Sequence, residues 1–201
     1  FRSNRAVYGA GIFFYNKANN NRFLSEFSSN VANSSGGAMV FHNTTNNNYF
    51  VGSFVSNSAL GEKLGDVWNG NGCAITFSDV SSNCVFTCDF VNNTAAERGG
   101  AVNYKKTPHN FTFNGDFISN NASYGGALVF FESIDNLVFN GEFNGNFAEY
   151  GGAIAAVEGV IENATFKNNH AECGGAIYFI EKGVVINSNF TNNSAYGPAG
   201  L

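Results

Sequence analysis

Three carboxylates recur at one position of the sequence, and they are the residues best suited to chemistry. Asp89, Asp116 and Glu142 each stand directly before a phenylalanine, at intervals of 27 and 26 residues. If these intervals are stacked strands, the three carboxylates lie roughly 5 Å apart. Carboxylate pairs at that distance are typical of retaining glycoside hydrolases, and a cluster of carboxylates is also a ligand set for calcium.

The surroundings of this acidic column favour a solvated charged face over either kind of site. Neighbouring positions supply no histidine, no arginine and no aromatic side chain suited to stacking on a sugar. We therefore predict no enzyme, no bound metal and no cofactor, and Asp89, Asp116 and Glu142 are the only candidates for a metal site. Elsewhere the same position is occupied by Glu26, Ser53, Thr165 and Asn189.

One segment, residues 60–68, interrupts a regular spacing and contains Trp68, the only tryptophan. Tryptophan is over-represented among the residues that dominate protein interfaces, so this loop insertion is a candidate binding site. The alternative is that the loop folds back and Trp68 covers the flank of the molecule. The candidate binding residues are Leu60, Glu62, Lys63, Leu64, Asp66, Val67 and Trp68.

The four cysteines and three histidines do not form a recognisable reactive cluster. Cys84 and Cys88, four residues apart on one strand, are about 13 Å apart, which is too far for a disulfide. No Cys-x-x-Cys spacing indicates metal binding. We expect buried free thiols, with one disulfide that includes Cys73 as the open alternative; Cys173 lies three repeats further on. His42, His109 and His170 occupy different positions of the repeat, so we expect lone surface histidines.

The elements that must position these residues are defined by an internal repeat. The pattern Phe-x-x-Asn-x-Ala occurs eight times, and its phenylalanines are 26, 27, 36, 27, 26, 23 and 24 residues apart. A period of this length indicates a solenoid. The phenylalanines are Phe1, Phe27, Phe54, Phe90, Phe117, Phe143, Phe166 and Phe190, and a Gly-Gly-Ala motif follows at Gly36, Gly99, Gly125, Gly151 and Gly174, with altered forms at Gly9, Gly72 and Gly197.

Alternating side chains before each phenylalanine predict strands. The residue two before it is always small, and the residue four before it is a large apolar one in every repeat but one. Such alternation is typical of a strand with one buried face. A second strand follows the glycines, with Ile12, Met39, Ile75, Val102, Leu128, Ile154 and Ile177 in register. The prediction is an all-β, right-handed parallel β-helix of about seven to eight turns, with columns of phenylalanine inside.

Asparagine is predicted to have two roles at the bends. The asparagine of the first motif can satisfy buried backbone groups and its counterparts in neighbouring turns, which predicts an asparagine ladder. Seven residues before the phenylalanine, asparagine or glycine marks a left-handed bend, at Asn20, Asn47, Asn83, Asn110, Asn136, Gly159 and Gly183. The predicted structural residues are Phe27, Phe54, Phe90, Phe117, Phe143, Asn30, Asn57, Asn93, Asn120 and Asn146.

Two other repeat architectures fit less well. A helical repeat is disfavoured because Gly, Asn, Phe and Val are poor helix formers. A leucine-rich repeat needs large apolar residues two and five positions before its motif residue. In this chain the residue two positions before the motif phenylalanine is always small.

The paired motifs resemble a known family of repeats. Gly-Gly-Ala-Ile at 151–154 and 174–177, Gly-Gly-Ala-Leu at 125–128 and Phe-Thr-Asn-Asn at 190–193 are similar to the repeat of the polymorphic outer membrane proteins of chlamydiae. They look equally like the adhesin-like surface proteins of methanogenic archaea. The resemblance implies a cell-surface or secreted β-helix with a role in adhesion, and it brings no catalytic residues.

Composition limits the remaining possibilities. Charged residues make up 12% of the chain and the net charge is −5, so there is no basic footprint for nucleic acid. Apolar runs are far shorter than a membrane span. We expect one β-helix domain over 1–201, and, because Phe1 opens a motif and Leu201 breaks off inside one, a segment of a longer repeat protein. Eight glycosylation sequons, at Asn33, Asn43, Asn92, Asn110, Asn121, Asn163, Asn189 and Asn192, are compatible with an extracellular protein.

The functional hypothesis is a cell-surface adhesin segment. Its partners would be other cells, surface proteins or glycans, and binding would use a broad face instead of a pocket. The alternatives are a polysaccharide-active enzyme on a pectate-lyase-like β-helix and a passive surface stalk.

Overall fold

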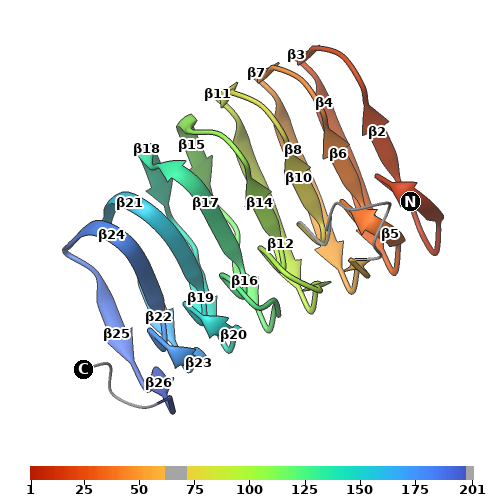
Figure 1. Cartoon of the computed structure of the whole chain (residues 1–201). Helices are drawn as coiled ribbons and strands as arrows, with labels where there is room; N and C mark the ends of the chain where they lie inside the picture. Colours follow the sequence, from red (N-terminus) through yellow and green to blue (C-terminus); the bar gives the residue numbers. More distant parts are fainter. Residues whose placement is uncertain (62–71, 198–201) are drawn as a thin grey trace.

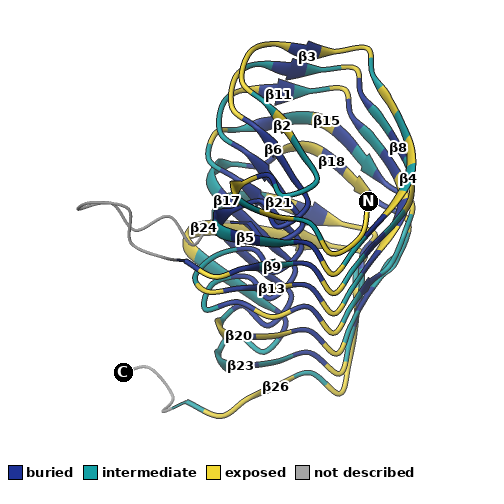
Figure 2. Ribbon diagram, turned by 90° about the vertical axis from the view of Figure 1, so that its right-hand side faces the viewer, coloured by how far each residue is buried: buried dark blue, intermediate teal, exposed yellow. Residues whose placement is uncertain are grey.

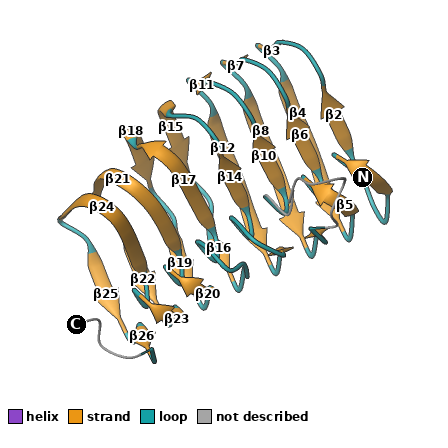
Figure 3. Cartoon of the chain, viewed as in Figure 1, coloured by secondary structure: helices purple, strands orange, loops and turns teal. Residues whose placement is uncertain are grey.

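The computed structural model describes residues 1–61 and 72–197, which form a stack of parallel strands (Figure 1). Successive turns lie directly on one another from the N-terminus to the C-terminus. Figure 3 shows strands and loops only, without a helix in the described part of the chain. There is accordingly no helix among these residues with the length and apolarity needed to cross a membrane. The prediction of an all-β parallel solenoid of about seven to eight turns is confirmed, with about seven turns present.

One wall of the solenoid is a seven-stranded parallel sheet with one strand per turn. Its register pairs Ile12 with Met39, Met39 with Ile75, and so on through Ile177, as the sequence predicted. The strands are β2 (Ile12–Phe14), β6 (Met39–Phe41), β10 (Ile75–Phe77), β14 (Val102–Tyr104), β17 (Leu128–Ser133), β21 (Ile154–Glu162) and β24 (Ile177–Ile186).

A twelve-stranded sheet carries the predicted strands before the phenylalanines, together with the short strands of the bend. Its members are β3 (Ala18–Asn19), β4 (Arg22–Ser28), β7 (Thr45–Asn46), β8 (Tyr49–Val55), β11 (Ser81–Ser82), β12 (Val85–Val91), β15 (Pro108–Phe113), β16 (Phe117–Ile118), β18 (Asp135–Phe139), β19 (Glu142–Asn144), β22 (Thr165–Lys167) and β25 (Asn189–Thr191).

The third wall follows the ladder asparagines. Isolated bridges of Asn121 to Thr94 and Phe147 join its two sheets. The first sheet contains β1 (Arg5–Tyr8), β5 (Val31–Ser35), β9 (Ser58–Ala59) and β13 (Thr94–Ala95), and the second contains β20 (Phe147–Tyr150), β23 (His170–Cys173) and β26 (Ser194–Ala195).

Aromatic rings fill the interior in continuous columns. The eight motif phenylalanines stack with ring centroids 4.7–5.0 Å apart and planes within 15° of parallel. A second column runs from Phe23 through Phe50, Phe86 and Phe113 to Phe139. Figure 2 shows buried residues alternating with exposed ones along the walls. Both predicted columns are confirmed.

The sequence analysis missed a third aromatic column. It comprises Phe14, Phe41, Phe77, Tyr104 and Phe130, stacked at 5.0–5.2 Å. Each of these rings stands two residues after the register position of the seven-stranded sheet, so a period-two reading of that strand would have found it. Its rings meet those of the second column edge to face, for example Phe41 and Phe50. Edge-to-face contacts between offset columns are a favourable aromatic geometry.

The asparagine ladder is present along the whole stack. Each amide nitrogen donates to the side-chain oxygen of the next asparagine at 2.8–3.0 Å, from Asn4 to Asn193. That side-chain oxygen also accepts the backbone N–H of the same donating asparagine, at 2.9–3.2 Å. The second amide hydrogen reaches a motif phenylalanine carbonyl at 2.8–3.1 Å. The ladder prediction is therefore confirmed.

The left-handed bend is confirmed in five turns and changes in the last two. The five predicted asparagines have φ between 52° and 58°. Gly159 has φ 141°, whereas Gly183 does not have a positive φ, so the bend predicted there is wrong. The reason is that these turns are shorter between the glycine pair and the phenylalanine, and β21 and β24 run straight through the position.

Candidate functional site

The acidic column holds neighbouring turns together instead of forming a reactive pair. The backbone N–H of Asp116 donates to Asp89 Oδ1 at 2.9 Å, and the N–H of Glu142 donates to Asp116 Oδ1 at 2.8 Å. These bonds replace the sheet ladder where Gly115 and Gly141 bring the backbones close together. A carboxylate that accepts a backbone N–H stabilises the structure, so this position favours aspartate for a structural reason.

Glu142 has a cationic partner that the sequence analysis missed. Lys167 Nζ lies 2.6 Å from Glu142 Oε2, and Asn144 donates to Oε1 at 3.0 Å. The hydrogen bond from Lys167, followed by that from Asn144, holds the pKa of Glu142 below its usual range. An ionised carboxylate is a poor general acid. Only histidine and arginine were expected to mark a partner here, although Lys167 stands two residues after Thr165, which pairs with Glu142 in the next turn.

A shallow polar depression of about 300 Å³ lies over this column. Asp116, Asn140, Gly141, Glu142, Thr165 and Lys167 line it. Over residues 1–61 and 72–197, no three His, Cys, Asp or Glu side chains gather closely enough to hold a metal ion. The carboxylates of the column are thus distributed along the stack instead of converging.

The loop insertion lies almost wholly outside the described residues. This applies to Glu62, Lys63, Leu64, Asp66, Val67 and Trp68, so their role as binding residues stays a prediction. Leu60 is described: its side chain is about half exposed, and its N–H donates to Ala32 O at 2.9 Å. The chain is described again from Gly72, which precedes β10.

A set of exposed aromatic side chains gathers on the outer face of the seven-stranded sheet near its first strand. Phe13 points outward from β2 because Ile12 and Phe14 on either side pack against the core. Its ring lies 6.3 Å from Tyr8, 6.3 Å from Tyr15 and 6.2 Å from His42. Tyr15 and His42 stack at 5.3 Å with planes 11° apart. Tyr15 is 66% exposed, so most of its surface is open to solvent.

These rings line a groove of about 500 Å³. Its floor includes Val40 and Thr76, and its polar side consists of Ser78, Asp79 and Lys105. We call Tyr8, Phe13, Tyr15, His42, Ser78, Asp79 and Lys105 the aromatic groove. Its volume lies within the roughly 300–1,000 Å³ range of small-molecule sites.

The aromatic groove was not predicted from the sequence. Binding through a broad face concerns a partner and stays a prediction, and the expectation of no sugar-stacking aromatic concerned only the surroundings of the acidic column. The groove was missed because four of its residues occupy the same position of the repeat but differ in type from turn to turn. These residues are Tyr15, His42, Ser78 and Lys105. A search for repetition cannot detect a site that depends on variation. The only available signal was Phe-Phe-Tyr at 13–15, outside the buried pattern.

Lys105 contributes an unpaired, partly buried cation to the groove. Burial, and then the charge of Arg98, lower the pKa of its ammonium group. None of the described carboxylates forms an ion pair with it. The adjacent Lys106 differs, since its Nζ lies 2.8 Å from Glu132 Oε1. The ammonium group of Lys105 is therefore partly shielded from water, and no carboxylate among the described residues compensates for the lost solvation.

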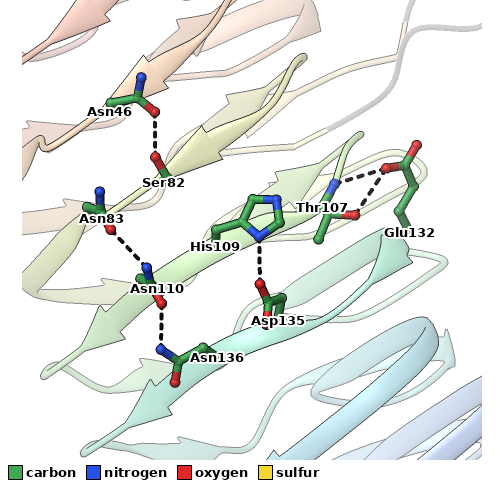
Figure 4. A network of polar contacts seen from close by, with 9 residues as sticks. All are labelled: Asn46, Ser82, Asn83, Thr107, His109, Asn110, Glu132, Asp135 and Asn136. Carbon is green, nitrogen blue, oxygen red and sulfur yellow. Dashed lines mark hydrogen bonds and ion pairs between the residues drawn. The ribbon is translucent and has the colours of Figure 1, made fainter.

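The neighbouring bend is polar, and its side chains bond to each other (Figure 4). Asn83, Asn110 and Asn136 form an exposed ladder, with Asn110 Nδ2 donating to Asn83 Oδ1 at 3.0 Å. His109 Nδ1 lies 2.6 Å from Asp135 Oδ2. The expectation of lone histidines is therefore wrong. Stacking places Tyr15 beside His42 and Ser194 beside His170 at equivalent positions of neighbouring turns, and His170 also stacks on Tyr196 at 4.7 Å.

All four cysteines are free, as expected, and the disulfide alternative does not occur. Cys73, Cys84 and Cys88 are buried, while Cys173 is only partly buried. Burial raises the pKa of the Cys84 thiol to about 11 and raises the pKa of Cys73 and Cys88 as well. A buried thiol that stays protonated behaves as a small apolar side chain.

Stacked parallel strands, aromatic columns and an asparagine ladder define a β-solenoid repeat protein. The family model of the Chlamydia polymorphic membrane protein repeat matches residues 163–180. This stretch contains one unit of both motifs, including Phe166, Asn169 and Gly174, so the resemblance noted in the sequence is confirmed. The chain therefore carries a repeat of the polymorphic membrane protein type. No curated protein and no solved structure is significantly similar to it.

Proposed function

We propose that this solenoid is an adhesive segment of a cell-surface protein and that it contacts its partner through the aromatic groove. The observation that carries the proposal is the exposed set of Tyr8, Phe13, Tyr15 and His42 beside a groove of about 500 Å³. Aromatic side chains supply large contact areas at interfaces. The repeat match supports a surface location, because the matching family is described as membrane proteins. Other cells, surface proteins or glycans are the proposed partners.

The stacked scaffold suits this role. The groove takes side chains from four successive turns, and the register of β2, β6, β10 and β14 fixes their spacing. Preorganised side chains lose little conformational entropy on binding. We propose further that the insertion at 60–68 contributes contacts of its own, with Trp68 as the anchor, because it lengthens the spacing of the motif phenylalanines to 36 residues.

Cell attachment tests the groove. The fluorescently labelled chain is added to intact cells, and bound label is compared for the unchanged chain, the double variant Phe13→Ala/Tyr15→Ala, and Tyr196→Ala. Tyr196 is a matched control because it is also exposed, at 56%, and lies far along the stack. We expect the double variant to lose at least about 10-fold in apparent affinity, equivalent to about 1.4 kcal/mol, and the control to bind normally. Equal attachment by all three would refute the proposal.

Deletion of residues 60–68 tests the insertion separately. We expect reduced attachment without a change in the free energy of unfolding. If attachment is unchanged while the groove variant fails, the loop has no part in binding. If neither change has any effect, the passive stalk is the better account.

Polysaccharide cleavage remains the second candidate because a depression lies over Asp116, Glu142 and Lys167. Its test is the release of reducing ends from polysaccharides by the unchanged chain and by Asp89→Asn and Asp116→Asn. Activity that disappears in either variant would replace adhesion by catalysis. We expect no cleavage by any of them, because these carboxylates bind backbone N–H groups and Glu142 is held ionised.

A further inference from the structure

We propose that the aromatic groove binds an oligosaccharide carrying a single carboxylate, with a sugar ring packed against Phe13 and the edge of Tyr15 and the carboxylate at Lys105. The inference deepens the proposed function and rests on it, since it names the ligand class of the same site. Three features of the groove carry it: its exposed rings, its cation and the pairing of its strands.

The rings offer flat apolar surfaces of the size of a sugar ring. Tyr15 is 66% exposed and Phe13 is 43% exposed. His42, at the equivalent position of the next turn, stacks on the face of Tyr15 that is turned toward Lys105, so a ligand in the groove meets the edge of Tyr15 and the ring of Phe13. The apolar face of a pyranose can cover the ring of Phe13, and a following sugar residue then reaches Ser78 and Asp79, which lie two turns further along the stack, about 10 Å away. Pockets that combine aromatic walls with a few placed polar groups are typical of specific ligand sites.

The charges of the groove favour a ligand with a single negative charge. Lys105 is partly buried without an ion-pair partner among the described residues, and Arg98 adds positive potential. A carboxylate at Lys105 would form a charge-assisted hydrogen bond and offset the lost solvation. Asp79, whose Oδ1 accepts the N–H of Val80 at 2.8 Å, places a negative charge on the same side. A polyanion would be repelled there, whereas a monoacidic sugar can present a hydroxyl group to Asp79.

The strands below the groove disfavour a peptide. β6, β10 and β14 are each hydrogen-bonded to a neighbour on both sides. An extended peptide therefore finds no free strand edge at these three strands; β2, which carries Phe13, is the end strand of the sheet and is paired on one side only. A saccharide needs only the side chains that the groove presents.

Titration calorimetry on the purified chain tests the inference. The probes are sialyllactose, a disaccharide with one glucuronic acid, lactose as the neutral sugar, and heparin as a polyanion. We expect saturable binding of at least one acidic probe, weaker binding of lactose, and no preference for heparin. The two acidic probes distinguish a sialic acid from a uronic acid as the source of the carboxylate.

Two adjacent lysines give a matched pair of variants. Lys105→Met keeps the apolar stem and removes the charge, so affinity for the acidic probe should fall at least about 10-fold, to the level of lactose. Lys106→Met should have no effect, because Lys106 pairs with Glu132 outside the groove. Tyr15→Ala should weaken binding of acidic and neutral sugars alike. Unfolding by denaturant shows that each variant is folded.

The inference is overturned if no acidic sugar binds, if Lys105→Met binds like the unchanged chain, or if heparin binds best. These failures are separable from failure of the proposed function. Cell attachment that needs Tyr15 but does not compete with acidic sugars would leave the adhesive role intact and point to a protein ligand. Attachment that does not need Tyr15 would refute both.

Discussion

Asparagine suits the ladder position because every hydrogen-bonding group of its side chain has a partner there. At Asn120 the amide nitrogen donates to Asn146 Oδ1 and to Phe90 O, while its oxygen accepts two N–H groups of Asn93. All of this occurs without solvent, since Asn120 is fully buried. An amide has the two donors and the acceptor oxygen that this geometry requires, whereas aspartate has no donor when ionised.

We predict that Asn120→Ala lowers the free energy of unfolding by on the order of 3 kcal/mol, because buried donors on Asn93 lose their acceptor. Asn120→Asp should destabilise at least as much, since it buries a charge. The control is Asn140→Ala, an exposed residue whose side chain donates to Asn114 Oδ1, for which we expect a change within about 0.5 kcal/mol. Denaturant unfolding gives all three values. Similar values for the buried and exposed sites would contradict the ladder's structural role.

Thiol reactivity follows burial. Alkylation of the folded protein at about pH 8 should modify Cys173, which is partly buried, and leave Cys73, Cys84 and Cys88 unmodified, because the thiolate is the reactive form and burial raises their pKa values. Peptide mass spectrometry identifies the modified sites. All four should react once the chain is unfolded in denaturant. Rapid native modification of Cys84 would contradict the packing described for this turn.

The pair of Glu142 and Lys167 predicts an acid-dependent loss of stability. The pKa of Glu142 is below its ordinary value of 4.5 in the folded chain. Its contribution to stability is therefore fully present above 4.5 and is lost as the pH falls through the lower folded value. Unfolding measured between about pH 5 and about pH 3 should show a shallower dependence in Glu142→Gln and in Lys167→Met. Unchanged slopes in both variants would show that the pair does not couple to folding.

At the scale of elements, the glycine pair determines how closely turns approach. A Cβ at Gly126 would lie 2.2 Å from Gly152 O and 2.6 Å from Phe147 O. Gly145 has room for a Cβ, with only Ser119 Oγ at 3.5 Å, but has φ 66°. Gly126 is thus required because a side chain has no space there, whereas Gly145 is required because its backbone is left-handed.

We predict that Gly126→Ala destabilises the chain by about 3 kcal/mol or more, because the backbone of the next turn cannot move away without breaking the sheet. Gly145→Ala should cost only about 1–2 kcal/mol, the penalty of a left-handed alanine. Thermal or denaturant unfolding distinguishes the two. A smaller loss at Gly126 than at Gly145 would contradict the proposed spacing of the turns.

The sequence predicted those elements whose residues recur and missed those whose residues vary. Phe90, Phe117 and Phe143 occupy equivalent environments in successive turns, so their spacing alone predicts their stacking. Gly183 matched the bend by position, but the shortened turn lets β24 continue through it. The backbone conformation at Gly183 depends on the length of its turn, which the residue type at that position does not indicate.

At the scale of the whole molecule, repetition builds the scaffold and variation builds the site. Tyr15, His42, Ser78 and Lys105 succeed one another along the outer face, and only the stack brings them into one groove. Their types are unremarkable in the sequence because they are 27, 36 and 27 residues apart. The acidic column, by contrast, was conspicuous in the sequence, and two of its members, Asp89 and Asp116, accept backbone N–H groups.

The most direct test compares these two faces in one cell-attachment experiment that also monitors polysaccharide cleavage. The variants are Phe13→Ala/Tyr15→Ala for the groove and Asp89→Asn/Asp116→Asn for the acidic column, each first shown to be folded. The account predicts that the groove variant loses attachment, that the acidic-column variant keeps it, and that neither the unchanged chain nor any variant cleaves polysaccharide. Attachment that survives loss of the groove aromatics but fails without Asp89 and Asp116 would contradict it.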